Sequence, residues 1–237
     1  MGFVFSAAHE KGTDMRLGFD IDGVFASIME AWCKGFAQVA GEDKFLPGDY
    51  PEPHDYNIHT ARGYTQEHAR LFWDMVHADP DWWFNLPTWV ENVAILREHI
   101  HDISHDHEVY FVTQRSGIQV KRQTEDWLLE HLDYSATVLI VGHGEKGNIA
   151  KSLNLDVFVE DYHENAIDIV RKSPSTRVYL INRRYNQMER LKTPAQGILS
   201  GVSWYRAVEL VRSRRVTDVG EVLRAESLIP YTGVALK

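Results

Sequence analysis

The sequence lacks several features that would assign it to a broad class of proteins. It contains one cysteine, Cys33, so an internal disulfide is excluded, which favours a reducing, cytoplasmic location. No run approaches the roughly 18–20 apolar residues that span a bilayer, so we expect no membrane partner. Positive charge is scarce as well. The net charge of −9 argues against a stable nucleic-acid partner, because such a protein needs a basic surface.

Most of the chain consists of short apolar runs that alternate with helical segments. Five runs are rich in Val, Ile and Phe with little polar alternation, as parallel strands covered on both faces are: 17–20, 109–113, 137–141, 156–160 and 177–181. Helices are expected at 24–39, 87–99, 116–131, 145–153, 162–171 and 204–212. This repetition predicts an α/β fold with a doubly wound parallel sheet.

One connection is too long for a simple crossover between strands. Residues 41–86 begin with an irregular stretch rich in Pro, Asp and Tyr, and continue with a helix expected at 65–77, for which Thr65 is the N-cap. A long insert in a compact domain is usually functional. We therefore interpret it as a small, mainly helical cap over the strand ends. The predicted organisation is a flexible leader (1–14), a core (15–40 and 87–212), the cap (41–86) and a C-terminal extension (213–237).

Polar side chains of several kinds follow the predicted strands. They are Asp20 and Asp22 after the first strand, Thr113, Gln114 and Arg115 after the second, Lys146 at a helix start, and Glu160 and Asp161 after the fourth. Ligands of doubly wound sheets bind at the carboxyl ends of the strands, so these residues predict one shared site. Each has an ordinary structural alternative, such as an Asp-Gly turn, a helix cap or a surface lysine. The order of the whole set carries the prediction.

This order resembles the four motifs of the haloacid dehalogenase-like (HAD) phosphatase superfamily. The motifs stand here as DIDG at 20–23, FVT at 111–113, Lys146 and VED at 159–161. Within the superfamily the chain is most similar to 5′(3′)-deoxyribonucleotidases, through DIDGVFA, WWFNLPTW and the helix at 121–127. The resemblance covers residues 15–212. It implies a Rossmann-like core, a cap inserted after the first strand-helix unit, and hydrolysis of phosphate monoesters.

Phosphate chemistry suggests a role for each of the motif residues. A carboxylate and a phosphate monoester are both anionic, so a cation must sit between them, and an oxygen-rich site suits Mg²⁺. We expect Asp20 to be the nucleophile that forms an aspartyl-phosphate, and Asp22 to be the acid and base. Thr113 and Lys146 complete the predicted catalytic set. The predicted metal ligands are Asp20, Asp22 and, as the resemblance implies, one of Asp161 and Glu160, with Asp161 preferred as the direct ligand.

The aromatic residues of the insert suit a substrate with a flat ring. The predicted substrate-binding residues are Gln114, Arg115, Trp73, Trp82, Tyr56 and Ile28. The cap's own core is an equally good place for Trp83 and Phe84. Two departures from the deoxyribonucleotidase pattern leave the base and sugar open. Ile28 replaces a Phe, and Gln114-Arg115 replaces Ser-Pro.

The sequence thus predicts a Mg²⁺-dependent phosphomonoesterase acting on (deoxy)nucleoside monophosphates. The open alternatives are a HAD-type phosphatase for sugar phosphates or nucleic-acid 5′ ends, and a phosphotransferase. The expected partner is a small-molecule phosphomonoester, and a homodimer is an open possibility. The histidine-rich stretch at 99–107 and the arginines at 183–184 are interpreted as solvated.

Overall fold

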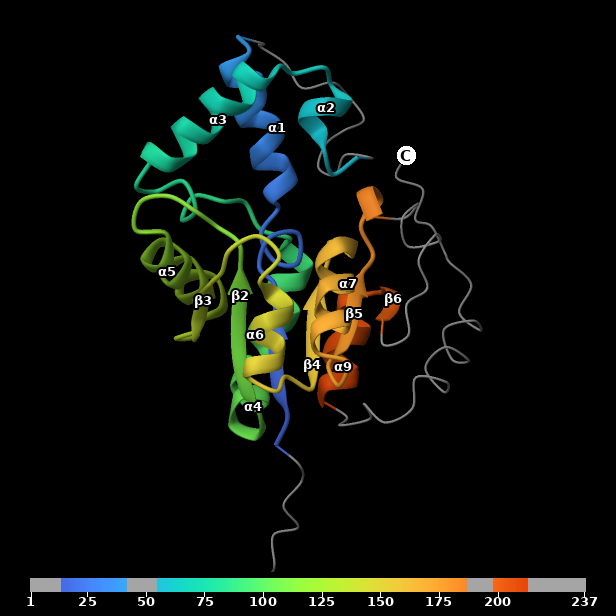
Figure 1. Ribbon diagram of the computed structural model, residues 1–237. Coiled ribbons are helices and arrows are strands. Elements are labelled where there is room, and N and C mark those ends of the chain that lie inside the picture. Colours follow the sequence, from blue (N-terminus) through green and yellow to red (C-terminus); the bar gives the residue numbers. More distant parts are fainter. Residues whose placement is uncertain (1–13, 42–54, 187–197, 213–237) are drawn as a thin grey trace, which may run out of the picture.

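The computed structural model describes residues 14–41, 55–186 and 198–212 (Figure 1). The predicted leader up to residue 13 and the predicted extension at 213–237 lie outside the described residues. The strands of this part of the chain form one parallel six-stranded sheet, in the order β3-β2-β1-β4-β5-β6. They are β1 (Arg16–Phe19), β2 (Glu108–Thr113), β3 (Val138–Ile140), β4 (Val157–Glu160), β5 (Arg177–Ile181) and β6 (Ile198–Val202). The predicted doubly wound α/β sheet is confirmed.

Five strands arise from the apolar runs that predict them, and their ends differ by one residue at most. In β4 every residue is buried, which explains why the three residues before Glu160 are all apolar. The sixth strand, β6, was not predicted. It is an edge strand of sequence ILSGV, and its Gly and Ser weaken the apolar pattern.

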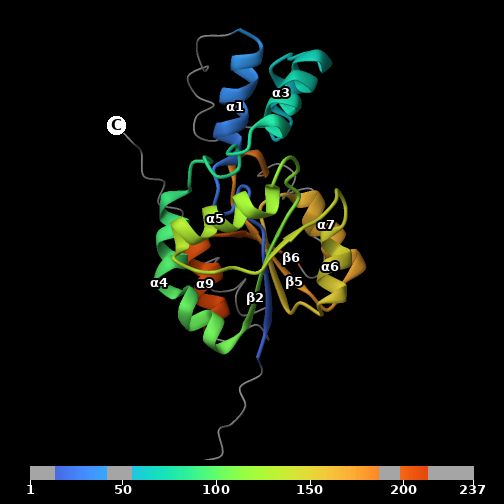
Figure 2. The ribbon, with the colours of Figure 1, turned by 90° about the vertical axis from the view of Figure 1, so that its left-hand side faces the viewer.

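Helices cover both faces of the sheet (Figure 2). One face carries α4 (Val90–Asp106), α5 (Val120–Leu132) and α9 (Trp204–Arg212), and the other carries α6 (Lys146–Ser152) and α7 (His163–Lys172). Helix α4 packs on both α5 and α9, and α6 packs on α7. Among the described helices, none combines the length and apolar character that crossing a bilayer needs.

Three further helices stand beyond the carboxyl ends of the strands: α1 (Ile28–Val39), α2 (Ile58–Ala61) and α3 (Gln66–Ala78) (Figure 1). We call them the outer helices. Helix α1 packs on α3 through Phe36 and Phe72, whose rings stack with centroids 4.4 Å apart. The predicted N-cap of α3 is confirmed, because the Thr65 hydroxyl accepts a hydrogen bond from the His68 N–H at 3.2 Å. The division of the chain into core and cap stays a prediction.

Helix α1 begins at Ile28 rather than at Val24 because the chain first makes a compact loop, residues 21–26. The N–H of Phe25 donates to the carbonyl of Ile21 at 2.8 Å, and the N–H of Gly23 donates to that of Ala26 at 2.8 Å. Only Asp20 separates this loop from the end of β1. The loop therefore presents its one polar side chain, that of Asp22, at the carboxyl edge of the sheet.

Candidate active site

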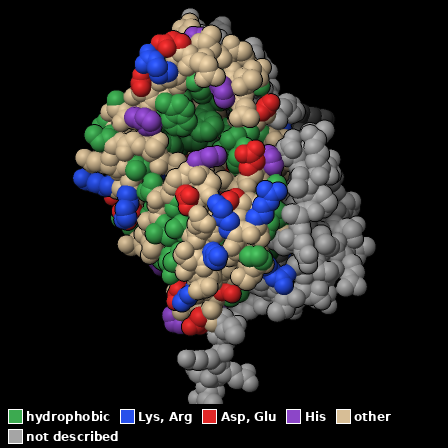
Figure 3. Space-filling model, in the orientation of Figure 1, with side chains coloured by type: hydrophobic (Ala, Val, Ile, Leu, Met, Phe, Trp, Pro, Cys, Tyr) green, Lys and Arg blue, Asp and Glu red, His purple; other side chains and the backbone are tan. Residues whose placement is uncertain are grey.

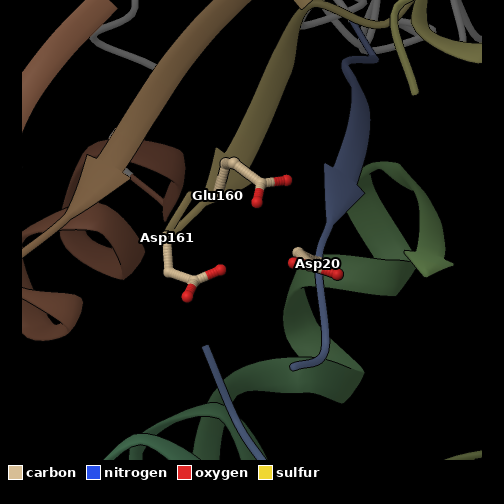
Figure 4. Close-up of side chains that lie close together, drawn as sticks. All are labelled: Asp20, Glu160 and Asp161. Carbon is tan, nitrogen blue, oxygen red and sulfur yellow. The ribbon is translucent and has the colours of Figure 1, made fainter. Parts of the chain in front are cut away.

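The site lies where the strand order reverses, between the central strands β1 and β4. The connections from these two strands run to opposite sides, which opens a crevice at their carboxyl ends. Asp20 directly follows β1, and its N–H donates to the carbonyl of Val159 in β4 at 2.9 Å. Glu160 ends β4 and Asp161 follows it. The prediction that these acids meet is confirmed, since Figure 4 shows their three carboxylates facing one space.

A buried lysine ties the two strands together at this edge. The Nζ atom of Lys146 lies 2.8 Å from Oδ2 of Asp20 and 2.8 Å from Oε2 of Glu160. The other oxygen of Asp20 accepts the N–H of Ile21 at 2.8 Å. Burial by itself would lower the pKa of Lys146, but the two carboxylates raise it above its ordinary value, so the lysine stays protonated. The carboxyl group of Asp20 is therefore fixed from both sides.

The two acids after β4 have different partners. Glu160 accepts hydrogen bonds from Lys146, from the Tyr162 N–H at 3.1 Å and from Nδ2 of Asn165 at 3.2 Å. The carboxylate of Asp161 accepts one from the Tyr185 hydroxyl through Oδ2, and no described residue donates to its Oδ1. Glu160 is thus occupied by the protein, whereas Asp161 keeps an oxygen for a ligand.

These carboxylates fit a hard divalent cation. Ligand oxygens of Asp20, Glu160 and Asp161 lie within 4.8 Å of one another. Burial and the Glu160 carboxylate raise the pKa of Asp161 to about 7, which shows how costly a further negative charge is there. Together with Asp22 the site holds four carboxylates. Two cationic side chains form ion pairs with them: Lys146 with Asp20 and Glu160, and Arg115 with Asp22. The excess negative charge and the all-oxygen donors suit Mg²⁺.

Asp22 and Thr113 meet as predicted, at the ends of β1 and β2. The Thr113 hydroxyl donates to Oδ2 of Asp22 at 3.1 Å. Arg115 is placed differently from the prediction that it binds substrate. Its guanidinium is buried behind Asp22, to which it forms an ion pair at 2.8 Å, and it does not line the cavity. Gln114 does line the cavity.

A cavity of about 240 Å³ opens above these acids. Figure 3 shows hydrophobic side chains around a hollow beneath the outer helices, with histidines at its rim. The cavity is lined by Asp20, Asp22, Ile28, Trp32, Tyr56, Trp73, Trp83, Thr113, Gln114, His143, Lys146, Asp161, Tyr162 and Asn165. The aromatic wall is well ordered by ring contacts. Tyr56 stacks on Tyr162 at 4.0 Å, and Trp32 meets both Tyr56 and Trp73 edge to face at 5.8 Å.

Of the predicted aromatic contacts, Tyr56 and Trp73 line the cavity and Trp82 does not. The indole of Trp82 packs instead on Phe72, with centroids 5.7 Å apart, inside the contact between the outer helices. Its neighbour Trp83 takes the place in the cavity wall. Consecutive residues in a turn point in different directions, so the pattern WW could not show which of them faces the substrate.

Sequence reasoning missed a supporting segment, residues 182–186, that comes from the end of β5. The predicted solvated position of Arg183 is wrong. Its side chain is buried, and Nε donates to the carbonyl of Gly23 at 2.5 Å. Tyr185 contacts Asp161, and Nδ2 of Asn186 donates to the carbonyl of Asp161 at 2.8 Å. The polar sequence NRRYN gave no sign that it folds inward. Trp32, one helical turn after Ile28, was missed as well, although that spacing puts both on one face of α1.

The histidine-rich stretch belongs mainly to the exposed end of α4. Within the described residues its histidines form no metal-binding group with neighbouring acids. His107 is the buried exception, and its Nδ1 accepts a hydrogen bond from the N–H of Met15 at 3.3 Å.

Comparisons with known proteins agree on the fold. No family model matches the sequence. The chain is 24% identical over 215 residues to the Bacillus subtilis (strain 168) protein named "Putative nucleotidase YqfW", covering 85% of this chain and 95% of the relative. A HAD family hydrolase from Deinococcus radiodurans R1, solved with bound phosphate and sodium, has a TM-score of 0.50 at 11% identity and covers 86% of this chain and 96% of that chain.

A second solved structure, a "putative haloacid dehalogenase-like hydrolase" from Burkholderia xenovorans LB400, has a TM-score of 0.50 at 10% identity. It covers 84% of this chain and 97% of that chain. These likenesses confirm the HAD-like fold that the motif resemblance predicts.

Gly23 should tolerate no side chain. Its φ is +80°, and a Cβ atom there would collide with the Asp161 carboxylate and lie 2.5 Å from the Tyr185 hydroxyl. Gly63 has a similar φ of +72° but open space around it. We expect Gly63→Ala to cost about 1–2 kcal/mol for the left-handed backbone, and Gly23→Ala to cost roughly a further 1–3 kcal/mol for the collision. Urea unfolding of both variants measures the difference, and equal losses would contradict the collision.

The partners of Asp161 predict how cation binding responds to mutation. Asp161→Asn should abolish measurable Mg²⁺ binding, and Tyr185→Phe should weaken it by about 10-fold or more, as loss of a supporting hydrogen bond does. Tyr205→Phe, which removes a hydroxyl from a 66% exposed side chain, is the matched control and should change nothing. Calorimetric titration with Mg²⁺ measures the affinity. Unchanged Mg²⁺ affinity in Asp161→Asn would show that the cation is held by other residues.

Proposed function

We propose that this chain is a Mg²⁺-dependent phosphomonoesterase that hydrolyses (deoxy)nucleoside monophosphates through an aspartyl-phosphate on Asp20. The observation that carries the proposal is one buried carboxyl group, held by Lys146 and the Ile21 N–H, at the floor of a cavity with an aromatic wall. The nucleotidase name of the Bacillus relative supports the substrate class. The phosphate in the Deinococcus structure supports the type of ligand.

The reaction proceeds in two steps on this chain's residues. A carboxylate oxygen of Asp20 attacks phosphorus while the ester P–O bond breaks, and Asp22 donates a proton to the leaving alcohol oxygen. Water then attacks the phosphorus of the aspartyl-phosphate, and Asp22 takes its proton. The acyl phosphate bond breaks, inorganic phosphate leaves and the Asp20 carboxylate is restored. One acid therefore serves first as proton donor and then as acceptor.

The other polar residues hold charge in place. Asp20 and Asp161 would hold Mg²⁺ with their side chains and Asp22 with its backbone carbonyl, while Glu160 anchors Lys146. When bound, Mg²⁺ offsets the repulsion between the nucleophile and the phosphate. Lys146 stabilises negative charge on Asp20 and on the transferring group. The Gln114 amide donates a hydrogen bond to a phosphate oxygen, and the Thr113 hydroxyl does so when it turns from Asp22 to the substrate.

The cavity wall favours a substrate that has a flat ring at some distance from its phosphate. Trp32, Tyr56 and Trp73 present ring faces and edges, and among the described residues the wall above the acids contains no lysine or arginine besides Lys146 at its floor. A nucleobase stacks on such a surface without a requirement for a particular base. A sugar phosphate would leave these rings without a partner.

The first test is phosphate release from a panel of mononucleotides and sugar phosphates, with Mg²⁺ and with EDTA. We expect release from mononucleotides, its loss in EDTA and its recovery when Mg²⁺ is added back. Asp20→Asn should abolish turnover, because an amide cannot form the phosphorylated intermediate, while its thermal melting stays cooperative. Near-normal turnover in Asp20→Asn would sink the mechanism, and activity on sugar phosphates alone would sink the substrate class.

The second test compares the two tryptophans that the structure separates. Trp73→Leu should raise KM for mononucleotides, because it removes a stacking interaction worth about 1–3 kcal/mol per base. KM for glycerol phosphate, which has no ring, should stay the same. Trp82→Leu removes an indole that lies outside the cavity, so it should lower the melting temperature without this KM effect. A KM increase for both substrates in Trp73→Leu would argue against base stacking.

A further inference from the structure

The buried guanidinium of Arg115 holds the carboxylate of Asp22 with more contacts than a single ion pair. Its Nε lies 3.1 Å from both oxygens of Asp22, and Nη2 lies 2.8 Å from Oδ1. The remaining nitrogen, Nη1, donates to the hydroxyl of Thr124 at 3.2 Å. The side chain of Arg115 is 0% exposed and that of Asp22 is 20% exposed. Arg115 therefore lies behind the acid, and the acid lies between it and the cavity.

The position of this guanidinium is itself fixed by two tryptophans. Its central carbon lies 5.0 Å from the ring centroid of Trp83 and 5.8 Å from that of Trp127. The Trp83 indole N–H donates to the carbonyl of Ser116 at 2.8 Å, and the Trp127 indole N–H donates to that of Leu86 at 2.9 Å. A cation packed between anchored rings cannot swing out to meet a substrate.

Fixing the acid matters because Asp22 lies on a loop rather than in a strand. A carboxylate on its own has several rotamers, and proton transfer requires one of them to face the leaving oxygen. Thr113 contributes a single hydrogen bond to Asp22, at 3.1 Å. The planar fork of Arg115 fixes both the direction and the tilt of the carboxylate, which a lysine could not do.

We propose that Arg115 is a positioning residue that orients the carboxyl group of Asp22, which gives the proton it carries to the leaving group in the first step and takes one from water in the second. This inference rests on the proposed function. Arg115 acts through Asp22, so its effect depends on whether the leaving group needs a proton. The alcohol of a nucleoside needs one, because an alkoxide is a poor leaving group. The p-nitrophenolate ion departs without one.

The test compares the first turnover of two substrates with enzyme in excess. Rapid mixing measures release of nucleoside from a nucleoside 5′-monophosphate and release of p-nitrophenol from p-nitrophenyl phosphate. The first turnover excludes the second step, in which water attack needs Asp22 for both substrates. In Arg115→Met we expect nucleoside release to fall by about 10²–10⁴-fold, the usual contribution of general acid catalysis. Release of p-nitrophenol should change by less than about 10-fold, because this leaving group needs no general acid.

Two further variants keep the test decisive. Arg115→Lys preserves the charge without the planar fork, and we expect the same substrate-selective loss at smaller size. If Arg115→Met does not fold, the comparison of the two substrates is made with Arg115→Lys instead. Arg122→Met removes an arginine from the exposed side of α5, where its side chain is 76% exposed, and should match the wild type.

The outcomes separate this inference from the proposed function. If the wild type releases neither product, the proposed function fails. If the wild type releases both and the Arg115 variants lose both equally, Arg115 has a structural role only and the inference is wrong. A selective gain in nucleoside release would also overturn it, because it would show that Arg115 restrains Asp22 from acting.

Discussion

The site depends on one electrostatic constraint, which is that four carboxylates converge at the ends of β1 and β4, three of them buried. Burying a charge without a partner costs several kcal/mol, so the fold must supply cations at the same place. Lys146 does this by bridging Asp20 and Glu160, and Arg115 does it for Asp22. The compensation is incomplete. An acid cluster left with negative charge in excess is a candidate site for a cation.

The loop after β1 satisfies this constraint because the chain turns tightly and is then held by the segment that follows β5. Gly23 leaves room for the Asp161 carboxylate, where any side chain would collide with it. Arg183 bonds the carbonyl of Gly23, and Asn186 bonds that of Asp161. The segment after β5 thus supports both the loop of residues 21–26 and Asp161. A substitution in residues 182–186 would therefore alter the positions of Gly23 and Asp161, although the substituted residue does not line the cavity.

Sequence reasoning placed the acids, Thr113 and Lys146 correctly, because strand ends in a parallel sheet share one edge whatever the details of packing. It failed where the direction of a side chain decides. Gln114 and Arg115 are neighbours in one polar turn, yet one lines the cavity and the other is buried between Trp83 and Trp127. Contacts between residues far apart in the chain set those directions, and no local pattern encodes them. The same reason hid Tyr185 in a segment that reads as a polar loop.

The charged floor and the aromatic wall of the cavity come from different parts of the fold, and they meet at one pair of rings. Tyr162 follows Asp161 directly and donates its N–H to Glu160, so it belongs to the floor. Tyr56 precedes α2 and stacks on Tyr162 at 4.0 Å, while its ring also lies 5.6 Å from that of Tyr185. A base that displaces or extends this stack therefore acts on residues that contact the acids. Under the proposed function, this contact would couple recognition of the ring to placement of the phosphate and would favour a nucleotide over an equally charged substrate without a ring.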